Sequence, residues 1–238
     1  MKPVVIFRHA PTEGPGYFAT YLERRGIPWR VVKVDEGEPV PDDPRAFSGL
    51  AFMGGPMSVN DDLPWISSAL ALIRGAVAAA VPVAGHCLGG QLMAKAMGGV
   101  VTRNPVKEIG WGRVDVLGSP AAEHWFGASL DSFESFHWHG ETFSIPPGAT
   151  RLASSPHCEN QVFALGPHLG MQCHVEMTPE LIRSWCQDWE HEVRALAARV
   201  SSVQSPAEMA RGIESRVHAL NAVADRLYDR WTRGLKGR

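Results

Sequence analysis

Short apolar runs alternate with segments of helical spacing through the first hundred residues. Four apolar runs predict buried strands, and they span residues 3–8, 29–34, 50–53 and 81–84. Between them, residues 16–25 form a predicted helix that ends at Gly26. Residues 63–80 form a second, with Asp62 as the expected N-cap and Pro64 in the first turn. Strands that alternate with helices are typical of a parallel sheet covered on both faces.

From about residue 100 the pattern changes to short strands separated by turns. These predicted strands span residues 112–117, 132–138, 162–165 and 170–173. Residues 179–231 have helical spacing, and Pro206 divides them into two predicted helices, the second capped by Ser205. The whole pattern predicts an α/β fold with a mixed, largely parallel sheet flanked by helices. A small antiparallel section and C-terminal helices complete it.

A single cysteine stands where the fourth predicted strand turns into a helix. Residues 81–93 read Val-Pro-Val-Ala-Gly-His-Cys-Leu-Gly-Gly-Gln-Leu-Met, which places Cys87 in a tight corner between Gly85 and Gly89. Glycine suits such a corner because a Cβ would crowd the backbone. The corner lifts the sulfur clear of the sheet, and the helix that begins behind it favours the thiolate. This is the layout of a nucleophile elbow with cysteine in place of serine.

A thiol nucleophile needs a base, and the base needs a group that orients it. His174 and Glu176 follow the predicted strand at 170–173 and lie two positions apart. Their side chains should therefore face one site together, because residues two apart in an extended chain point to the same side. Glu176 can then hold the imidazole in the tautomer that accepts the proton of Cys87.

Acyl transfer also needs hydrogen-bond donors for an oxyanion. The amide of Leu88 directly follows the cysteine at a helix start. A second donor can come from Gly55, in the Gly-Gly-Pro segment after the third predicted strand, because glycine lets the backbone approach a ligand closely.

Two further histidines flank Trp138 near the end of another predicted strand. His137 and His139 can line a pocket or act as an H-x-H metal pair. No obvious third and fourth ligand accompanies them, and the four cysteines show no C-x-x-C spacing. We therefore expect no metal site.

Composition narrows the classes of partner. The chain has 238 residues, of which 45% are hydrophobic and 20% charged, as in ordinary globular domains. Its net charge of -2 gives no reason to expect nucleic-acid or membrane partners. No apolar run reaches the roughly 18–20 residues of a membrane span, and the opening run is too short for a signal peptide. With cysteines that suggest no disulfide framework, we expect a cytoplasmic protein.

These residues together resemble class I glutamine amidotransferases, particularly the glutaminase domain of GMP synthase and its free-standing relatives. The resemblance runs from Val4 to about Pro179. Its markers are Gly54-Gly55-Pro56, the elbow with Gly85, Cys87, Gly89 and Gln91, Glu108-Ile109-Gly110-Trp111, His139-Gly140-Glu141, Asn160-Gln161, and Gln172-Cys173-His174-Val175-Glu176.

The resemblance implies that Cys87 attacks the side-chain amide of glutamine to give a γ-glutamyl thioester and ammonia. His174 would act as base and then acid, with Glu176 as its orienting group. The amides of Gly55 and Leu88 would form the oxyanion hole. Substrate-binding roles would fall to Gln91 and His139. No cofactor is implied, and the implied fold is flavodoxin-like.

Two departures from the family pattern qualify these expectations. Val175 stands where many members have proline, in a position that should face away from the pair. No glycine-rich pyrophosphate loop of the GMP synthase nucleotide-activating domain is present. We expect an amidotransferase-like domain over residues 1–178 and a helical extension over 179–238 packed on the same domain. The candidate protein partners are a second copy of the chain and a separate synthetase subunit.

Three alternatives remain open. A hydrolase of the same fold would cleave γ-glutamyl peptides or γ-glutamyl amines with the same chemistry at Cys87. Phe7-Arg8-His9-Ala10-Pro11-Thr12-Glu13 is similar to the opening motif of histidine phosphatases, in which His9 would accept a phosphoryl group, although Ala10 replaces the usual glycine. A regulatory protein that keeps the fold without activity is the third.

Overall fold

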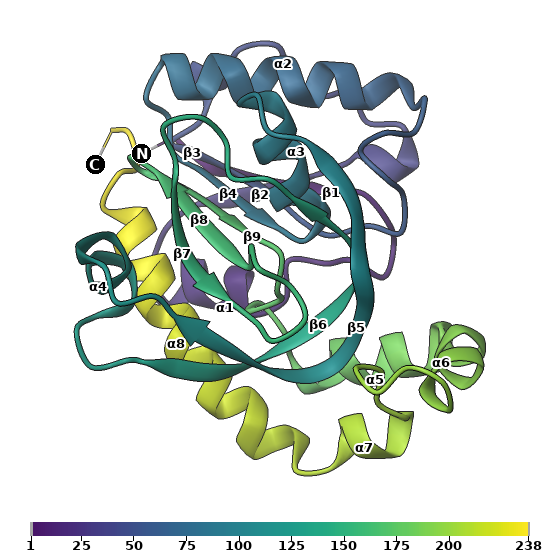
Figure 1. The fold of residues 1–238 in the computed structure, drawn as a ribbon. Helices are drawn as coiled ribbons and strands as arrows, with labels where there is room; N and C mark the ends of the chain where they lie inside the picture. The colour runs from purple at the N-terminus through teal and green to yellow at the C-terminus, as the bar shows by residue number, and fades with distance from the viewer. Residues whose placement is uncertain (1, 238) are drawn as a thin grey trace.

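The computed structural model describes residues 2–237 and contains one nine-stranded sheet, in the order β2-β1-β3-β4-β9-β8-β7-β5-β6 (Figure 1). Its first five strands are parallel, and the remaining four join it antiparallel. The parallel order is that of flavodoxin-like sheets, in which ligands bind outside the carboxyl ends of the strands. The predicted α/β class with a mixed sheet is therefore confirmed.

The parallel half is built from alternating strands and helices. Its strands are β1 (Val4–Arg8), β2 (Trp29–Lys33), β3 (Gly49–Phe52), β4 (Val83–His86) and β9 (His168–Met171). The helices of this half are α1 (Gly16–Arg24), α2 (Pro64–Ala78) and α3 (Leu88–Ala96), with short 3-10 turns η1 (Val34–Glu36) and η2 (Pro44–Ala46).

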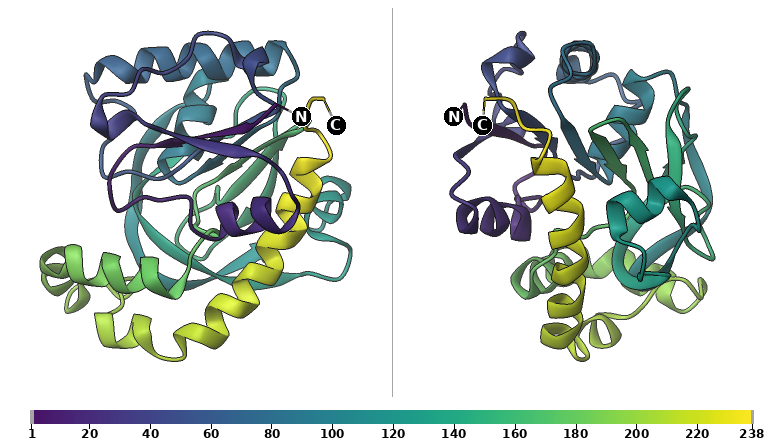
Figure 2. Two further views of the ribbon diagram at one scale, coloured as in Figure 1. Left: turned by 180° about the vertical axis from the view of Figure 1, so that it is seen from behind. Right: turned by 90° about the vertical axis from the view of Figure 1, so that its left-hand side faces the viewer.

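Side chains that alternate along each buried strand pack into two separate hydrophobic cores, one on each face of the sheet. In β1, Val4 and Ile6 pack on the face covered by α1, whereas Val5 and Phe7 pack on the face covered by α2 and α3. Figure 2 shows the first face, where α1 lies beside the long C-terminal helix α8 (Ile213–Thr232). Strands buried on both faces need continuous apolar runs, which explains why the sequence pattern located them.

The antiparallel half is larger than the sequence pattern suggested. Its strands are β5 (Val101–Val116), β6 (Ser132–Phe143), β7 (Thr150–Ser154) and β8 (Val162–Leu165). The prediction missed β7 and the first part of β5, which forms a long curved hairpin with β6. A register shift between Arg103 and Glu108 interrupts this hairpin. Exposed polar residues break the apolar alternation there, so periodicity alone gave no strand signal.

One helix prediction needs correction, and one further helix was not predicted. Helix α2 has Leu63 rather than Asp62 as its N-cap, and no side chain caps it. The sequence pattern also missed α4 (Pro120–Phe126), which Ser119 caps through its side chain. A proline in the first helical turn needs no N–H partner there, which lets α2 begin without a side-chain cap.

Residues 179–237, the described part of the C-terminal region, contain four helices instead of the two expected. They are α5 (Pro179–Asp188), α6 (Glu190–Ala197), α7 (Pro206–Ala210) and α8. Ser205 caps α7 as predicted, in a capping box with Glu208. Tyr228 and Trp231 of α8 are buried in the core shared with α1. Within residues 2–237, no helix is both long and apolar enough to span a bilayer.

Candidate active site

Cys87 occupies a strained corner between β4 and α3. Its backbone has φ 50° and ψ -108°, a conformation that residues other than glycine rarely adopt. The surrounding glycines are required by space. A Cβ on Gly85 would lie 2.4 Å from the backbone carbonyl carbon and oxygen of Gly89, and one on Gly89 would lie 2.0 Å from the carbonyl oxygen of Phe52. A strained backbone conformation that close packing holds in place is typical of a functional position.

The thiol of Cys87 faces a pocket of about 770 Å³ at the carboxyl ends of the parallel strands. The pocket is lined by the loops after β1 and β3, by Cys87 and α3, by the β5–β6 hairpin, and by Trp189 and Glu192 around the start of α6. Its predicted members are Gly55, Cys87, Gln91 and His139. A pocket of this size is in the range of small-molecule sites.

His174 and Glu176 meet behind Cys87, although β9 has already ended at Met171. The His174 Nδ1 lies 2.7 Å from Oε1 of Glu176, and both side chains are buried. The backbone N–H of His174 donates to the carbonyl of Phe136 in β6, which fixes this extended segment across the site. The two side chains share one site, but hydrogen bonds to β6 and to the start of α1 hold this segment there instead of a continuous strand.

The electrostatics of the pair follow from its burial. Burial opposes charge on His174, but Glu176 and the neighbouring Cys87 overcome it and hold the pKa of the imidazole well above its ordinary value. Burial likewise opposes charge on Glu176, yet His174 and then His86 lower the pKa of this carboxyl. Once His174 has taken the thiol proton, Glu176 stabilises the resulting imidazolium, which can then give that proton to a leaving group.

A second amide, which the sequence interpretation did not assign a role, connects Gln91 to the thiol. The Nε2 of Gln91 donates to Oε1 of Gln172 at 3.1 Å. The Nε2 of Gln172 in turn donates to Sγ of Cys87 at 3.5 Å. Gln172 stands directly after β9, the strand beside β4. That adjacency is a property of strand order and has no signal in the local sequence.

The two candidate oxyanion donors lie next to each other. A Cβ on Gly55 would come within 2.8 Å of Cδ2 of Leu88, so the loop after β3 packs on the start of α3. His9 supports this loop from behind, with Nδ1 at 3.1 Å from the carbonyl of Met53 and 3.3 Å from that of Gly54. Burial lowers the pKa of His9 to about 4, so it is neutral and structural at pH 7.

The geometry around His9 does not favour the phosphatase alternative. A phosphate site would need Arg8 free to bind phosphate oxygens. Instead Arg8 donates to Asp35 at 3.0 and 2.7 Å and to Glu36 at 2.6 Å. The motif at residues 8–12 therefore serves local structure.

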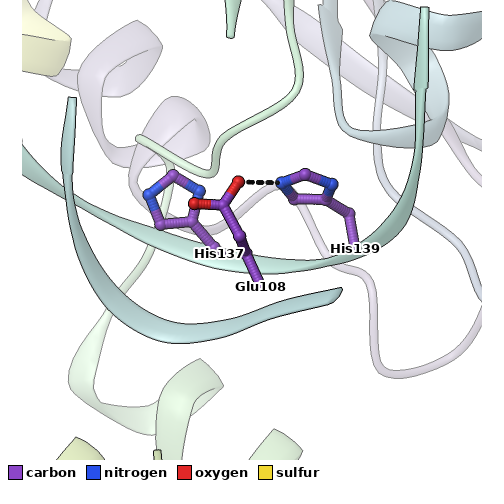
Figure 3. A group of neighbouring side chains, drawn as sticks. All are labelled: Glu108, His137 and His139. Atoms are coloured by element: carbon purple, nitrogen blue, oxygen red, sulfur yellow. Dashed lines mark ion pairs between the residues drawn. The ribbon is translucent and has the colours of Figure 1, made fainter. Parts of the chain in front are cut away.

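The structure supplies a third member for the His137 and His139 pair. Their ring nitrogens and a carboxylate oxygen of Glu108 all lie within 4.8 Å of one another, on facing positions of β5 and β6 (Figure 3). In residues 2–237 this is the cluster that could hold a metal ion. Glu108 already has protein partners, because Ser155 and Gln161 donate to it and Nε2 of His139 lies 3.0 Å from Oε2. These contacts hold the Glu108 carboxylate in place beside the pocket with protein groups alone.

Glu13, which the sequence interpretation left without a role, lines the same pocket as Cys87. The residue is only 5% exposed, and burial raises the pKa of its carboxyl to about 7 against the opposing effect of His174. It lies in the loop after β1, within the segment similar to phosphatases. No local pattern distinguishes it from a surface glutamate.

Fold and site together define a doubly wound α/β protein with a Cys–His–Glu cluster at the carboxyl edge of its sheet. Residues 17–185 match the family model of class-I glutamine amidotransferases. The chain therefore belongs to the class I glutamine amidotransferase family, as its motifs predicted.

Individual relatives agree with this assignment. The glutamine amidotransferase-like protein YfeJ of Salmonella typhimurium is 33% identical over 211 residues, covering 84% of this chain and 86% of that protein. A glutamine-hydrolysing GMP synthase subunit of Saccharolobus solfataricus is 32% identical over 136 residues, which are 56% of this chain and 69% of that protein. The crystal structure of a glutamine amido transferase from Methylobacillus flagellatus has a TM-score of 0.96 and 48% identity, covering 99% of this chain and 96% of that one.

Proposed function

We propose that the protein hydrolyses the side-chain amide of glutamine through a thioester on Cys87. The observation that carries this proposal is the 2.7 Å contact between His174 and Glu176 behind the elbow cysteine. His174 accepts the thiol proton, and the thiolate attacks the γ-carbonyl carbon. The C–N bond then breaks as His174 returns the proton to the nitrogen, which leaves as ammonia. Water, activated by the same imidazole, hydrolyses the thioester to glutamate.

Charge on the carbonyl oxygen develops beside the start of α3. The amides of Gly55 and Leu88 are the proposed donors to it, supported by the close packing of these two residues. Gln91 and His139 are the proposed contacts for the glutamyl group, because both line the pocket around the thiol. Their partners, Gln172 and Glu108, hold the two side chains in fixed orientations.

The ammonia acceptor belongs, in this proposal, to a separate synthetase. The match to the Saccharolobus solfataricus GMP synthase subunit supports it, since that name describes one component of a glutamine-hydrolysing enzyme. We propose a cytoplasmic protein that delivers ammonia to such a partner.

Glutamate release from glutamine tests the proposal directly. Wild type should release glutamate and ammonia in equal amounts, and Cys87→Ser should lose at least about 100-fold in rate because its hydroxyl is a far weaker nucleophile at pH 7. Cys186→Ser is the matched control, since Cys186 contacts the sulfur of Met209 in the C-terminal helices. Equal rates for wild type and Cys87→Ser, or no glutamate release by wild type, would exclude the proposed function.

A further inference from the structure

Glu13 is a buried carboxyl that faces the pocket without a protein partner. Among residues 2–237, no side-chain hydrogen bond or ion pair reaches its carboxylate, although the residue is only 5% exposed. Burying a carboxylate without compensation is costly. A buried carboxylate that lines a binding pocket and has no protein partner is suited to bind a cationic group of a ligand.

The position of Glu13 relates it to the leaving group of the reaction. A Cβ on Gly54 would lie 2.4 Å from Oε2 of Glu13 and 3.3 Å from Cε1 of His174, so both groups border the same point. In the proposed function, Nε2 of His174, bonded to this Cε1, gives the proton to the departing nitrogen. The carboxylate of Glu13 therefore lies close to the imidazole that protonates the leaving amine in the proposed function.

The rest of the pocket is also acidic. Besides Glu13, its walls carry the carboxylates of Asp61, Glu141 and Glu192, against two cations, Arg103 and Lys107. Lys107 is already paired with Glu192. The volume of about 770 Å³ also leaves room for more than the amide nitrogen of glutamine.

We propose that Glu13 forms a leaving-group subsite that selects γ-glutamyl amides of amines carrying a second, protonated nitrogen. This inference rests on the proposed function and names the substrate class of the same site. Cys87 attacks the γ-carbonyl, the bond to the amine nitrogen breaks, and His174 protonates that nitrogen. The diamine leaves with its distal ammonium on Glu13, and water releases glutamate from the thioester.

The test compares two amides of equal length that differ in one charge. The first is γ-glutamyl-1,4-diaminobutane, and the second is γ-glutamylpentylamide, which ends in a methyl group. Wild type should show kcat/KM at least about tenfold higher for the diamine amide, the factor that a modest buried charge contact provides. In Glu13→Gln that ratio should fall to near one, with Glu13→Asp in between. A wild-type ratio near one, or an unchanged ratio in Glu13→Gln, overturns the inference.

A binding measurement and a second variant separate the specific contact from general acidity. In a Cys87→Ser background, Glu13→Gln should weaken binding of the diamine amide at least tenfold more than binding of the pentylamide. Glu141→Gln removes another pocket carboxylate, one that accepts a hydrogen bond from Ser58, and should keep the preference. If it abolishes the preference equally, the assignment to Glu13 is wrong.

Glutamate release from glutamine shows whether the proposed function or only the Glu13 subsite fails. Glutamate release from glutamine without any preference for the diamine amide overturns the subsite and leaves the proposed function standing. If wild type releases glutamate from none of the three amides, both fail. Circular dichroism and melting temperature confirm that each variant is folded.

Discussion

The hydroxyl of Tyr228 lies 2.9 Å from Nε2 of His86, which joins the last long helix to the strand that ends at the elbow. Both side chains are fully buried, and His86 also lies 3.9 Å from Oε2 of Glu176. The C-terminal helix thus reaches the back of the Cys–His–Glu cluster. In this way a helix beyond the range of the family match contributes to the surroundings of the site.

Tyr228→Phe removes that hydroxyl and leaves the ring packing intact. Because a buried imidazole nitrogen loses its partner, we expect the free energy of unfolding to fall by about 1–3 kcal/mol, measured by urea denaturation. Tyr17→Phe is the matched control, because the Tyr17 hydroxyl contacts Asp225 and an exposed Arg24. An equal loss of unfolding free energy in both variants would mean that the His86 contact stabilises the fold no more than the contacts of Tyr17 do.

Gly89→Ala tests whether the elbow depends on close backbone approach. The new Cβ would lie 2.0 Å from the carbonyl oxygen of Phe52, and backbone on both sides has little freedom to move. We expect a loss of about 3 kcal/mol or a failure to fold. Gly118→Ala, where nothing lies within 4 Å, should change stability by less than about 1 kcal/mol. Thermal denaturation of both proteins gives the comparison.

Glu176→Gln keeps the shape of the side chain and removes its charge. The pKa of His174 should fall, because the carboxylate that raises it is gone, and an NMR titration of the ring protons measures this. Glutamine hydrolysis should fall by about 100-fold or more, since the imidazole loses its orienting group and its stabilised charge. A normal rate together with a lowered pKa would show that the carboxylate has no part in catalysis.

Glu13 should make the protein less stable as pH rises. Burial raises the pKa of its carboxyl from an ordinary value of 4.5 to about 7 in the folded state. Between these two pH values the folded protein therefore binds more protons than the unfolded chain. Its contribution is therefore complete below about pH 4.5 and lost as pH rises through 7, by up to about 3 kcal/mol. Glu13→Gln should lose less unfolding free energy than wild type between pH 5 and 8. Parallel pH profiles from urea denaturation would contradict this.

Local sequence determined the parts of this protein that depend on near neighbours. The apolar runs of β1 and β3 were recognisable because strands buried on both faces require them. The corner at Cys87 was visible because Gly85 and Gly89 are the residues its backbone can accommodate. The two-residue spacing of His174 and Glu176 at the end of an apolar run predicted that they face one site, and the structure brings them together.

Tertiary structure decided which distant segments meet. The pairing of β9 with β4 places Gln172 and His174 behind a cysteine more than eighty positions earlier in the chain. The same strand order places the loop after β1, with Glu13, on the wall of the Cys87 pocket. Periodicity reports which side of an element is buried, whereas strand order depends on how all buried faces are covered at once. The unpartnered carboxyl of Glu13 and the contact of Tyr228 with His86 therefore emerged only from the folded chain.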